Sequence, residues 1–115
     1  MTAIDRRRLA GAVVRDEIAH QGKTQDWAAD QMGMAFSSLN AVIHGEAGVT
    51  PLKLRSVAGA LRLPRRLLTD IVDGNAAQIR AIGDDEMRPS LRRAIVEGLT
   101  HIETQGRSSD YGLAF

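Results

Sequence analysis

The residues best suited to chemistry lie in one short segment, FSSLNAVIH, at residues 36–44. At helical spacing, Leu39, Val42 and Ile43 fall on one side and predict a buried stripe. Asparagine can bond an adenine edge in two places, serine can address either base of a pair, and apolar groups can contact a thymine methyl. The segment is therefore predicted to be a helix that reads the DNA major groove. Its outward face carries no carboxylate and consists of Phe36, Ser37, Asn40, Ala41 and His44.

A second short segment, directly upstream, is needed to position that helix. Residues 25–32 are predicted to form a helix with Thr24 as its N-cap, because a threonine oxygen can accept a backbone N–H of the first turn. Gly33 then supplies the tight turn into residues 36–44. Gln25 and the first N–H groups of this helix are placed to hold a DNA phosphate.

The rest of the chain is expected to be helical as well. Apolar residues recur at helical spacing almost throughout, and no alternating run predicts a strand, so the fold class is all-α. Further helices are expected at about residues 5–20, from Pro51 after a Thr50 cap, from Pro64 to Gly74, and at about 90–104. The residues expected to face the core are Leu9, Val13, Ile18, Trp27, Leu54, Val57, Ala58, Leu61, Leu67, Leu68, Ile71, Val72, Leu91, Ile95, Leu99 and Ile102.

The chain divides into three expected parts. Residues 1–75 are predicted to form a five-helix DNA-binding domain. Residues 76–104 are predicted to form a helical extension whose amphipathic C-terminal helix either packs on that domain or makes a homodimer. Residues 105–115 are expected to be a flexible tail.

Composition excludes several other classes of protein. The net charge is only +1, which is too small to indicate nucleic acid on its own, so the DNA prediction depends on the motif. The absence of cysteine excludes disulfides and thiolate metal sites and favours a reducing compartment. The N-terminus does not resemble a signal peptide and no segment could span a membrane, so we expect a cytoplasmic protein that does not bind membranes.

Catalytic and metal-binding patterns are not found either. His20 and His101 have no partners at metal-ligand spacing and are expected at the surface. The acidic run 84–86 is expected to be a polar loop, because three consecutive side chains point in different directions. No nucleophile–base pair and no phosphate-cradling glycine loop occurs, so we expect no enzyme activity, no cofactor, no metal and no small-molecule ligand.

The order of these residues is similar to that of a known family. Thr24-Gln25, Ala28-Ala29, Gly33-Met34, Leu39 and Gly45 are followed by Leu54, Val57-Ala58, Ala60-Leu61 and Leu67-Leu68. From Thr24 to Leu68 the chain resembles the lambda-repressor-like helix-turn-helix family, also called the Xre family. The resemblance implies that the second helix of the pair lies in the major groove and the first crosses the backbone. It also implies a double-stranded DNA operator as partner and transcription regulation as function, most simply repression by operator occupancy in the manner of a phage immunity repressor.

The chemistry of the outward face and the resemblance together predict residue roles. Residues predicted to meet bases or support such contacts are Gln25, Phe36, Ser37 and Asn40, and predicted phosphate contacts are Lys23, Thr24, Ser38, His44, Lys53 and Arg55. Two positions depart from the family pattern. Ala35 stands where a capping serine or threonine is usual. Because alanine cannot cap, this departure costs about 1 kcal/mol of helix stability. Phe36 stands where a polar base reader is usual and suggests a thymine-methyl contact or a wedge.

Several alternatives remain open at this point. Phe36 either folds back on residues 25–32 or enters the groove, and the run Arg6-Arg7-Arg8 either forms a solvated helix face or reaches phosphates. The ending SSDYGLAF is either an arbitrary flexible end or, through Asp110, Tyr111, Leu113 and Ala114, a signal similar to the tag that bacteria add to stalled proteins for proteolysis. The function is alternatively that of an antitoxin whose residues 76–115 hold a toxin, or that of a protein-interaction adaptor that has lost DNA binding.

Overall fold

The computed structural model describes residues 2–105, and every regular element in that range is a helix. This confirms the all-α prediction for the described part of the chain. The helices are α1 (Thr2–His20), α2 (Gln25–Met32), α3 (Phe36–Ile43), α4 (Pro51–Ala60), α5 (Leu67–Val72), α6 (Ala76–Arg80) and α7 (Pro89–Gln105).

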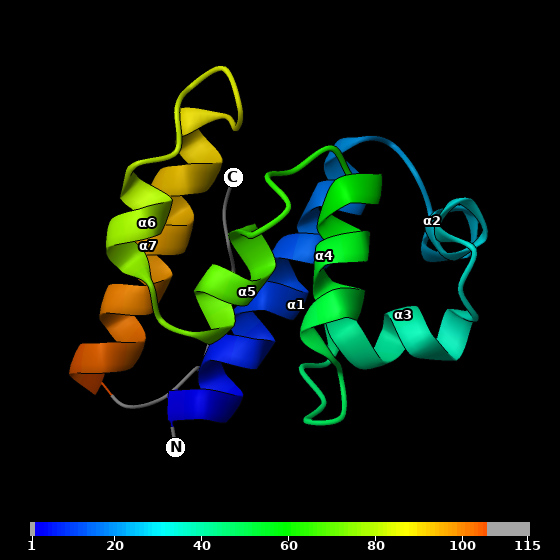
Figure 1. The fold of residues 1–115 in the computed structure, drawn as a ribbon, viewed down its shortest axis with the longest axis horizontal. Coiled ribbons are helices and arrows are strands. Elements are labelled where there is room, and N and C mark those ends of the chain that lie inside the picture. Colours follow the sequence, from blue (N-terminus) through cyan, green and yellow to red (C-terminus); the bar gives the residue numbers. More distant parts are fainter. Residues whose placement is uncertain (1, 106–115) are drawn as a thin grey trace.

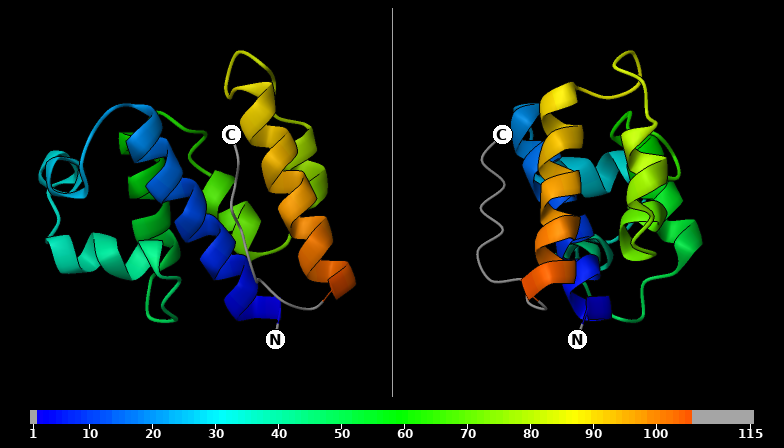
Figure 2. Two further views of the ribbon diagram at one scale, coloured as in Figure 1. Left: turned by 180° about the vertical axis from the view of Figure 1, so that it is seen from behind. Right: turned by 90° about the vertical axis from the view of Figure 1, so that its left-hand side faces the viewer.

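The helix α1 runs through the middle of the molecule, as Figure 1 shows. It packs against α3, α5 and α7, while α4 packs on α5 and α2. The helices α2 and α3 lie at one end of the long axis, and α6 and α7 lie together at the other (Figure 1). Seen from behind, α7 runs along the same side of the molecule as α1 (Figure 2). The two ends of the molecule are therefore joined through α1.

A single hydrophobic core extends from α1 to α7. The predicted stripes are buried in α1, α3, α4, α5 and α7, except that Val72 is only half-buried. The four α7 residues of the stripe (Leu91, Ile95, Leu99 and Ile102) are at most 1% exposed. Of the two roles considered for the C-terminal helix, its apolar stripe thus serves packing within the chain. A homodimer through α7 stays a prediction, and it would have to use the outward face of that helix.

The predicted helix starts at Thr24 and Thr50 are confirmed by their hydrogen bonds. The Thr24 hydroxyl oxygen accepts the Trp27 N–H at 3.2 Å, and the Thr50 oxygen accepts the Lys53 N–H at 3.2 Å. Ala35 makes no side-chain cap at the start of α3, as its side chain requires. Helix α3 thus begins with uncapped N–H groups.

Two expectations were wrong. Helix α5 begins at Leu67 rather than at Pro64, because the Leu67 N–H donates to the Pro64 carbonyl three residues back, at 2.9 Å, in a tight turn that precedes the helix. Trp27 is not a core residue, since its side chain is 41% exposed. Ala28 and Ala29 take the buried side of α2, which turns Trp27 outward.

Two kinds of feature are absent from the described residues. None of the helices is both long enough and apolar enough to cross a bilayer. Nowhere among residues 2–105 do three or more His, Cys, Asp or Glu side chains gather in a way that could hold a metal ion.

Candidate nucleic-acid interface

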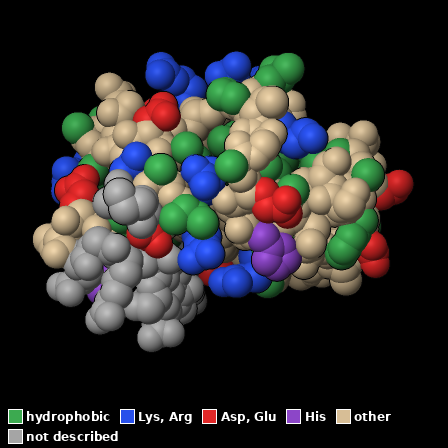
Figure 3. Space-filling model, turned by 90° about the horizontal axis from the view of Figure 1, so that it is seen from below, with side chains coloured by type: hydrophobic (Ala, Val, Ile, Leu, Met, Phe, Trp, Pro, Cys, Tyr) green, Lys and Arg blue, Asp and Glu red, His purple; other side chains and the backbone are tan. Residues whose placement is uncertain are grey.

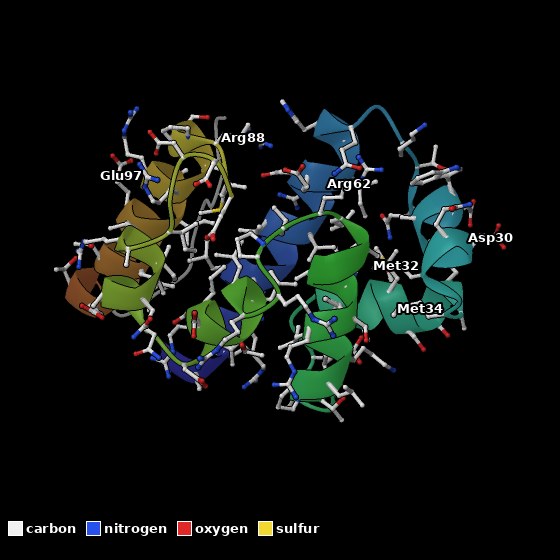
Figure 4. The ribbon with its side chains drawn as sticks, turned by 45° about the horizontal axis from the view of Figure 1, so that its top comes forward. Asp30, Met32, Met34, Arg62, Arg88 and Glu97 are labelled. Atoms are coloured by element: carbon white, nitrogen blue, oxygen red, sulfur yellow. The ribbon has the colours of Figure 1, made fainter. Side chains whose placement is uncertain are left out.

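The turn between α2 and α3 is fixed by Gly33. Its φ of 64° lies in the left-handed region, which glycine adopts without the steric cost of a Cβ. The Met34 N–H then donates to the Ala29 carbonyl at 3.0 Å and closes the end of α2. Figure 4 shows Met32 and Met34 at this junction, with Asp30 on α2 beside it. The chain therefore leaves α2 in a defined direction, and three residues, 33–35, separate α2 from α3.

Helix α3 is anchored on α1 by one face. Leu39, Val42 and Ile43 are buried, as predicted. A Cβ atom at Gly11 of α1 would overlap the carbonyl oxygen of Ile43, so the backbones of the two helices cross in direct contact. This contact fixes the end of α3 on the central helix and leaves the opposite face of α3 outside the core.

The outward face of α3 has the composition predicted for it. Phe36 is 47% exposed, Ser37 and His44 are exposed, and Asn40 and Ala41 are half-buried. The exposure of Phe36 excludes the alternative in which its ring is a core residue. No carboxylate occurs between Asp30 and Glu46. The α3 face therefore offers hydrogen-bonding and small apolar groups without the negative charge that would repel phosphate.

A shallow hollow of about 270 Å³ lies between α3 and the start of α4. It brings together three of the predicted DNA-contacting residues, Ser37, Ser38 and Lys53. The loop residues Glu46, Gly48 and Val49 line the other side. A phosphate could thus find two hydroxyl donors and an ammonium group at this place, with Glu46 restricting it to the serine and lysine side.

His44 sits at the C-terminal end of α3. Its Nδ1 lies 2.9 Å from the carbonyl oxygen of Asn40. A carbonyl only accepts, so Nδ1 must carry the proton, and Nε2 can donate to a phosphate only when the ring is doubly protonated. This hydrogen bond also fixes the ring relative to the helix end.

The other predicted contact residues are less directly placed. The Lys23 ammonium lies over the Trp27 ring, 4.7 Å from its centroid, and Thr24 is engaged as the α2 cap. The Gln25 Nε2 atom is buried and has no hydrogen-bond acceptor among the described residues, so it must move to reach DNA. Arg55 is half-buried on α4 and does not line the hollow.

The sequence did not predict the structural roles of two arginines. Arg6 donates from Nε to the carbonyl oxygen of Val72 at 2.7 Å, and Arg7 donates from Nε to that of Gly45 at 3.0 Å. Val72 is the last residue of α5, and Gly45 lies two residues after the last residue of α3. Backbone carbonyls at such helix ends lack helical partners. Nothing in the run of three arginines distinguishes these two from Arg8, because the distinction depends on where α3 and α5 end in space.

Figure 3 shows the underside of the molecule, as seen from below the view of Figure 1. Lys and Arg side chains gather along the middle of this face, with a histidine and a few acidic side chains beside them. The face is mixed in sign, in keeping with a net charge of only +1. Any binding of DNA by this face would therefore depend on the arrangement of particular groups.

The proposed degradation signal, Asp110, Tyr111, Leu113 and Ala114, lies outside the described residues. Comparison of the chain with protein-family models, with curated proteins and with solved structures finds no match.

Proposed function

We propose that this protein binds double-stranded DNA in a sequence-specific way through α3 and regulates transcription by occupying an operator. The observation that carries the proposal is the free face of α3. The opposite face of α3 is buried and the end of the helix lies against α1. The outward side chains are of kinds that can hydrogen-bond to base edges or contact a thymine methyl.

In the proposed complex α3 enters the major groove. Asn40 and Ser37 address base edges, and Phe36 contacts a thymine methyl or wedges beside it. Ser38 and Lys53 hold a phosphate in the hollow between α3 and α4. The N–H groups that Ala35 leaves uncapped are free to bind another phosphate, as helix N-termini do.

The proposal includes membership of the lambda-repressor-like family and a role similar to that of phage immunity repressors. It is supported by the succession of five helices from α1 to α5, by the short α2 and α3 joined at a left-handed glycine, and by the caps at Thr24 and Thr50. Operator occupancy requires no activity beyond binding, since a bound protein excludes polymerase from the same DNA.

The test is selection of bound duplexes from a random DNA pool, with wild-type protein and an Asn40→Ala variant in parallel. We expect a sharp consensus from the wild type, and a loss of discrimination of about 1–3 kcal/mol at one or two positions with the variant, because a bidentate base contact is removed. Thermal unfolding of both proteins controls for stability. No enrichment from the pool at low salt would reject the proposal.

One observation favours a second candidate, a protein-interaction adaptor. Two aromatic side chains, Trp27 on α2 and Phe36 on α3, are both more than 40% exposed at the same end of the molecule. Exposed aromatics are typical of protein interfaces. The salt dependence of binding separates the candidates: phosphate neutralisation gives a steep negative slope of log K against log salt, which binding to a protein need not show.

A further inference from the structure

Arg6, Arg7 and Arg8 are consecutive residues of α1 with different surroundings. Arg6 and Arg7 are half-buried and donate to backbone carbonyls of other elements, whereas Arg8 is exposed. Among residues 2–105, Arg8 makes no ion pair and no side-chain hydrogen bond. The first two charges are thus engaged inside the fold, and the third is not.

The segment that follows α3 lies directly against α1 at these arginines. Gly45 has a φ of 70°, and a Cβ added to it would lie 2.7 Å from the backbone nitrogen of Arg8 and 2.9 Å from the carbonyl carbon of Arg7. His44 is the C-cap of α3 and Gly45 follows it, so the backbone of Arg8 lies against the segment that directly follows the proposed DNA-reading helix.

The Arg7 side chain also binds the segment that follows α3. Its guanidinium binds the Gly45 carbonyl. Arg7 also lines a small cavity of about 30 Å³ that lies between the end of α3 (Val42), α4 (Leu54) and α5 (Val72). Arg6 makes the equivalent bond to the carbonyl of Val72, at the end of α5. Both arginines thus donate from α1 to a backbone carbonyl, but Arg7 binds the segment that follows α3 and Arg6 binds α5.

We propose that the DNA interface extends onto α1, where Arg8 contacts a backbone phosphate beside the C-terminal end of α3 and Arg7 acts as a positioning residue for α3. This inference rests on the proposed DNA binding. An exposed guanidinium without an internal partner is well suited to phosphate, which it can bind with two parallel N–H donors. Asp5, the acidic residue one turn earlier in α1, is buried and is not an exposed competitor.

The first experiment measures affinity for the selected duplex over a range of salt concentrations, with Arg8→Ala, Arg8→Lys and Arg15→Ala. Arg15 is the matched control, because it is also exposed on α1 but pairs with Asp16 at 3.4 Å. We expect Arg8→Ala to weaken binding and to reduce the magnitude of the salt slope by about 0.9, the value for one phosphate contact on duplex DNA. Arg8→Lys should keep most of the slope, and Arg15→Ala should behave as wild type.

Either of two results would overturn the role of Arg8. In one, Arg8→Ala keeps the wild-type slope. In the other, Arg15→Ala loses as much slope as Arg8→Ala, which would indicate a general effect of charge. Both results presuppose a wild-type protein that binds DNA, so they are distinguishable from failure of the proposed function, in which the wild type itself selects no sequence and the inference falls with it.

The second experiment compares Arg7→Ala with Arg6→Ala, since each loses one hydrogen bond to a carbonyl. We expect both variants to unfold at a lower temperature. Only Arg7→Ala should also relax base selection and raise the dissociation rate, because Arg7, unlike Arg6, binds the segment that follows α3. Arg7→Lys should restore part of the selection. Equal base selection by Arg7→Ala and wild type, measured well below the unfolding temperature, would show that Arg7 is merely structural.

Discussion

Helices α3 and α7 use the same amphipathic pattern at opposite ends of the molecule, with different results. Each buries an apolar stripe against α1. Each also lies beside a surface hollow of about 270 Å³. The outward face of α7 carries charges of both signs, including Arg93 and Glu97, whereas that of α3 carries no Lys, Arg, Asp or Glu.

Positive charge alone would favour the α7 end over the proposed interface on α3. Three arginines, Arg80, Arg92 and Arg93, line the hollow beside α7, against one lysine beside α3. Arg92, however, is engaged with Asp84 and with the Ile82 carbonyl, both at 2.7 Å, and Glu97 lies in the same hollow. The comparison teaches that a candidate DNA-reading surface is better recognised by uncommitted hydrogen-bonding groups on an anchored helix than by a count of basic residues.

The largest effect should come from separating α3 from α1. Gly11→Val places a side chain where the Ile43 carbonyl lies, and we expect it to lower the free energy of unfolding by about 3 kcal/mol or more and to abolish DNA binding. The control is Gly59→Ala in α4, where a Cβ meets nothing within 4 Å, so that helix propensity should raise the free energy of unfolding by about 0.5–1 kcal/mol. Urea unfolding measures both. A stable Gly11→Val protein would contradict the direct crossing of the two helices.

A smaller loss is expected at the α7 end. Glu17 of α1 is buried. Its Oε1 accepts a hydrogen bond from Arg88 at 2.7 Å, and its Oε2 accepts one from Gln21 at 3.0 Å. Arg88 lies where the chain enters α7 (Figure 4). Glu17→Ala leaves these donors without the carboxylate and should cost about 2–3 kcal/mol of stability, discounted for the partial exposure of Arg88.

The same Glu17→Ala variant also tests whether the two ends are independent. Base selection should be unchanged wherever the protein is folded, because the α3 face is untouched. Arg15→Ala, which breaks the exposed pair with Asp16, should stay within about 0.5 kcal/mol of wild type. Altered base selection in Glu17→Ala would show that the α7 end controls the α3 face.

Phe36 sharpens the comparison on the α3 side. Because the ring is 47% exposed, Phe36→Ala should change the free energy of unfolding by no more than about 1 kcal/mol. It should nevertheless change the preferred base at one operator position, where the thymine-methyl contact is lost. Val96→Ala on α7 is the control and should leave base preference unaltered. An unchanged consensus with Phe36→Ala would remove Phe36 from the interface.

The smallest change in the free energy of unfolding is expected between the α3 end and the α7 end of the molecule. Arg62, just after α4, has a φ of 60°, in the left-handed region that disfavours residues with a Cβ (Figure 4). Arg62→Gly should therefore raise the free energy of unfolding by roughly 0.5 kcal/mol, after allowance for the greater unfolded-state entropy of glycine. The midpoint of urea unfolding measures this. A decrease would mean that the arginine side chain contributes more than its backbone strain costs.

The sequence by itself determined the helical elements and their buried faces. The spacing of Leu39, Val42 and Ile43 predicted which side of α3 is buried, and Thr24 and Thr50 predicted where α2 and α4 begin, because periodicity and capping are local properties. Because these three residues of α3 face the core, the other side chains of the helix were predicted to face outward. Local rules failed for Trp27, because Ala28 and Ala29 take the buried side of α2 and residue type alone does not show which side of a short helix meets the core.

Only the tertiary structure decided how equivalent residues are used. Arg6, Arg7 and Arg8 are three consecutive residues of the same type, and no local pattern distinguishes them. Two of them donate to carbonyls inside the fold and the third is exposed, because the ends of α5 and α3 meet α1 beside Arg6 and Arg7. The same holds for the two hollows, because each is formed where neighbouring segments of the chain, within residues 37–53 and within residues 80–97, pack together. It also holds for the buried Gln25 amide and for the stripe of α7, which could equally have faced a second copy until its packing against α1 was known. Periodicity shows that the apolar face of a helix must be buried, and only the tertiary structure shows which element buries it.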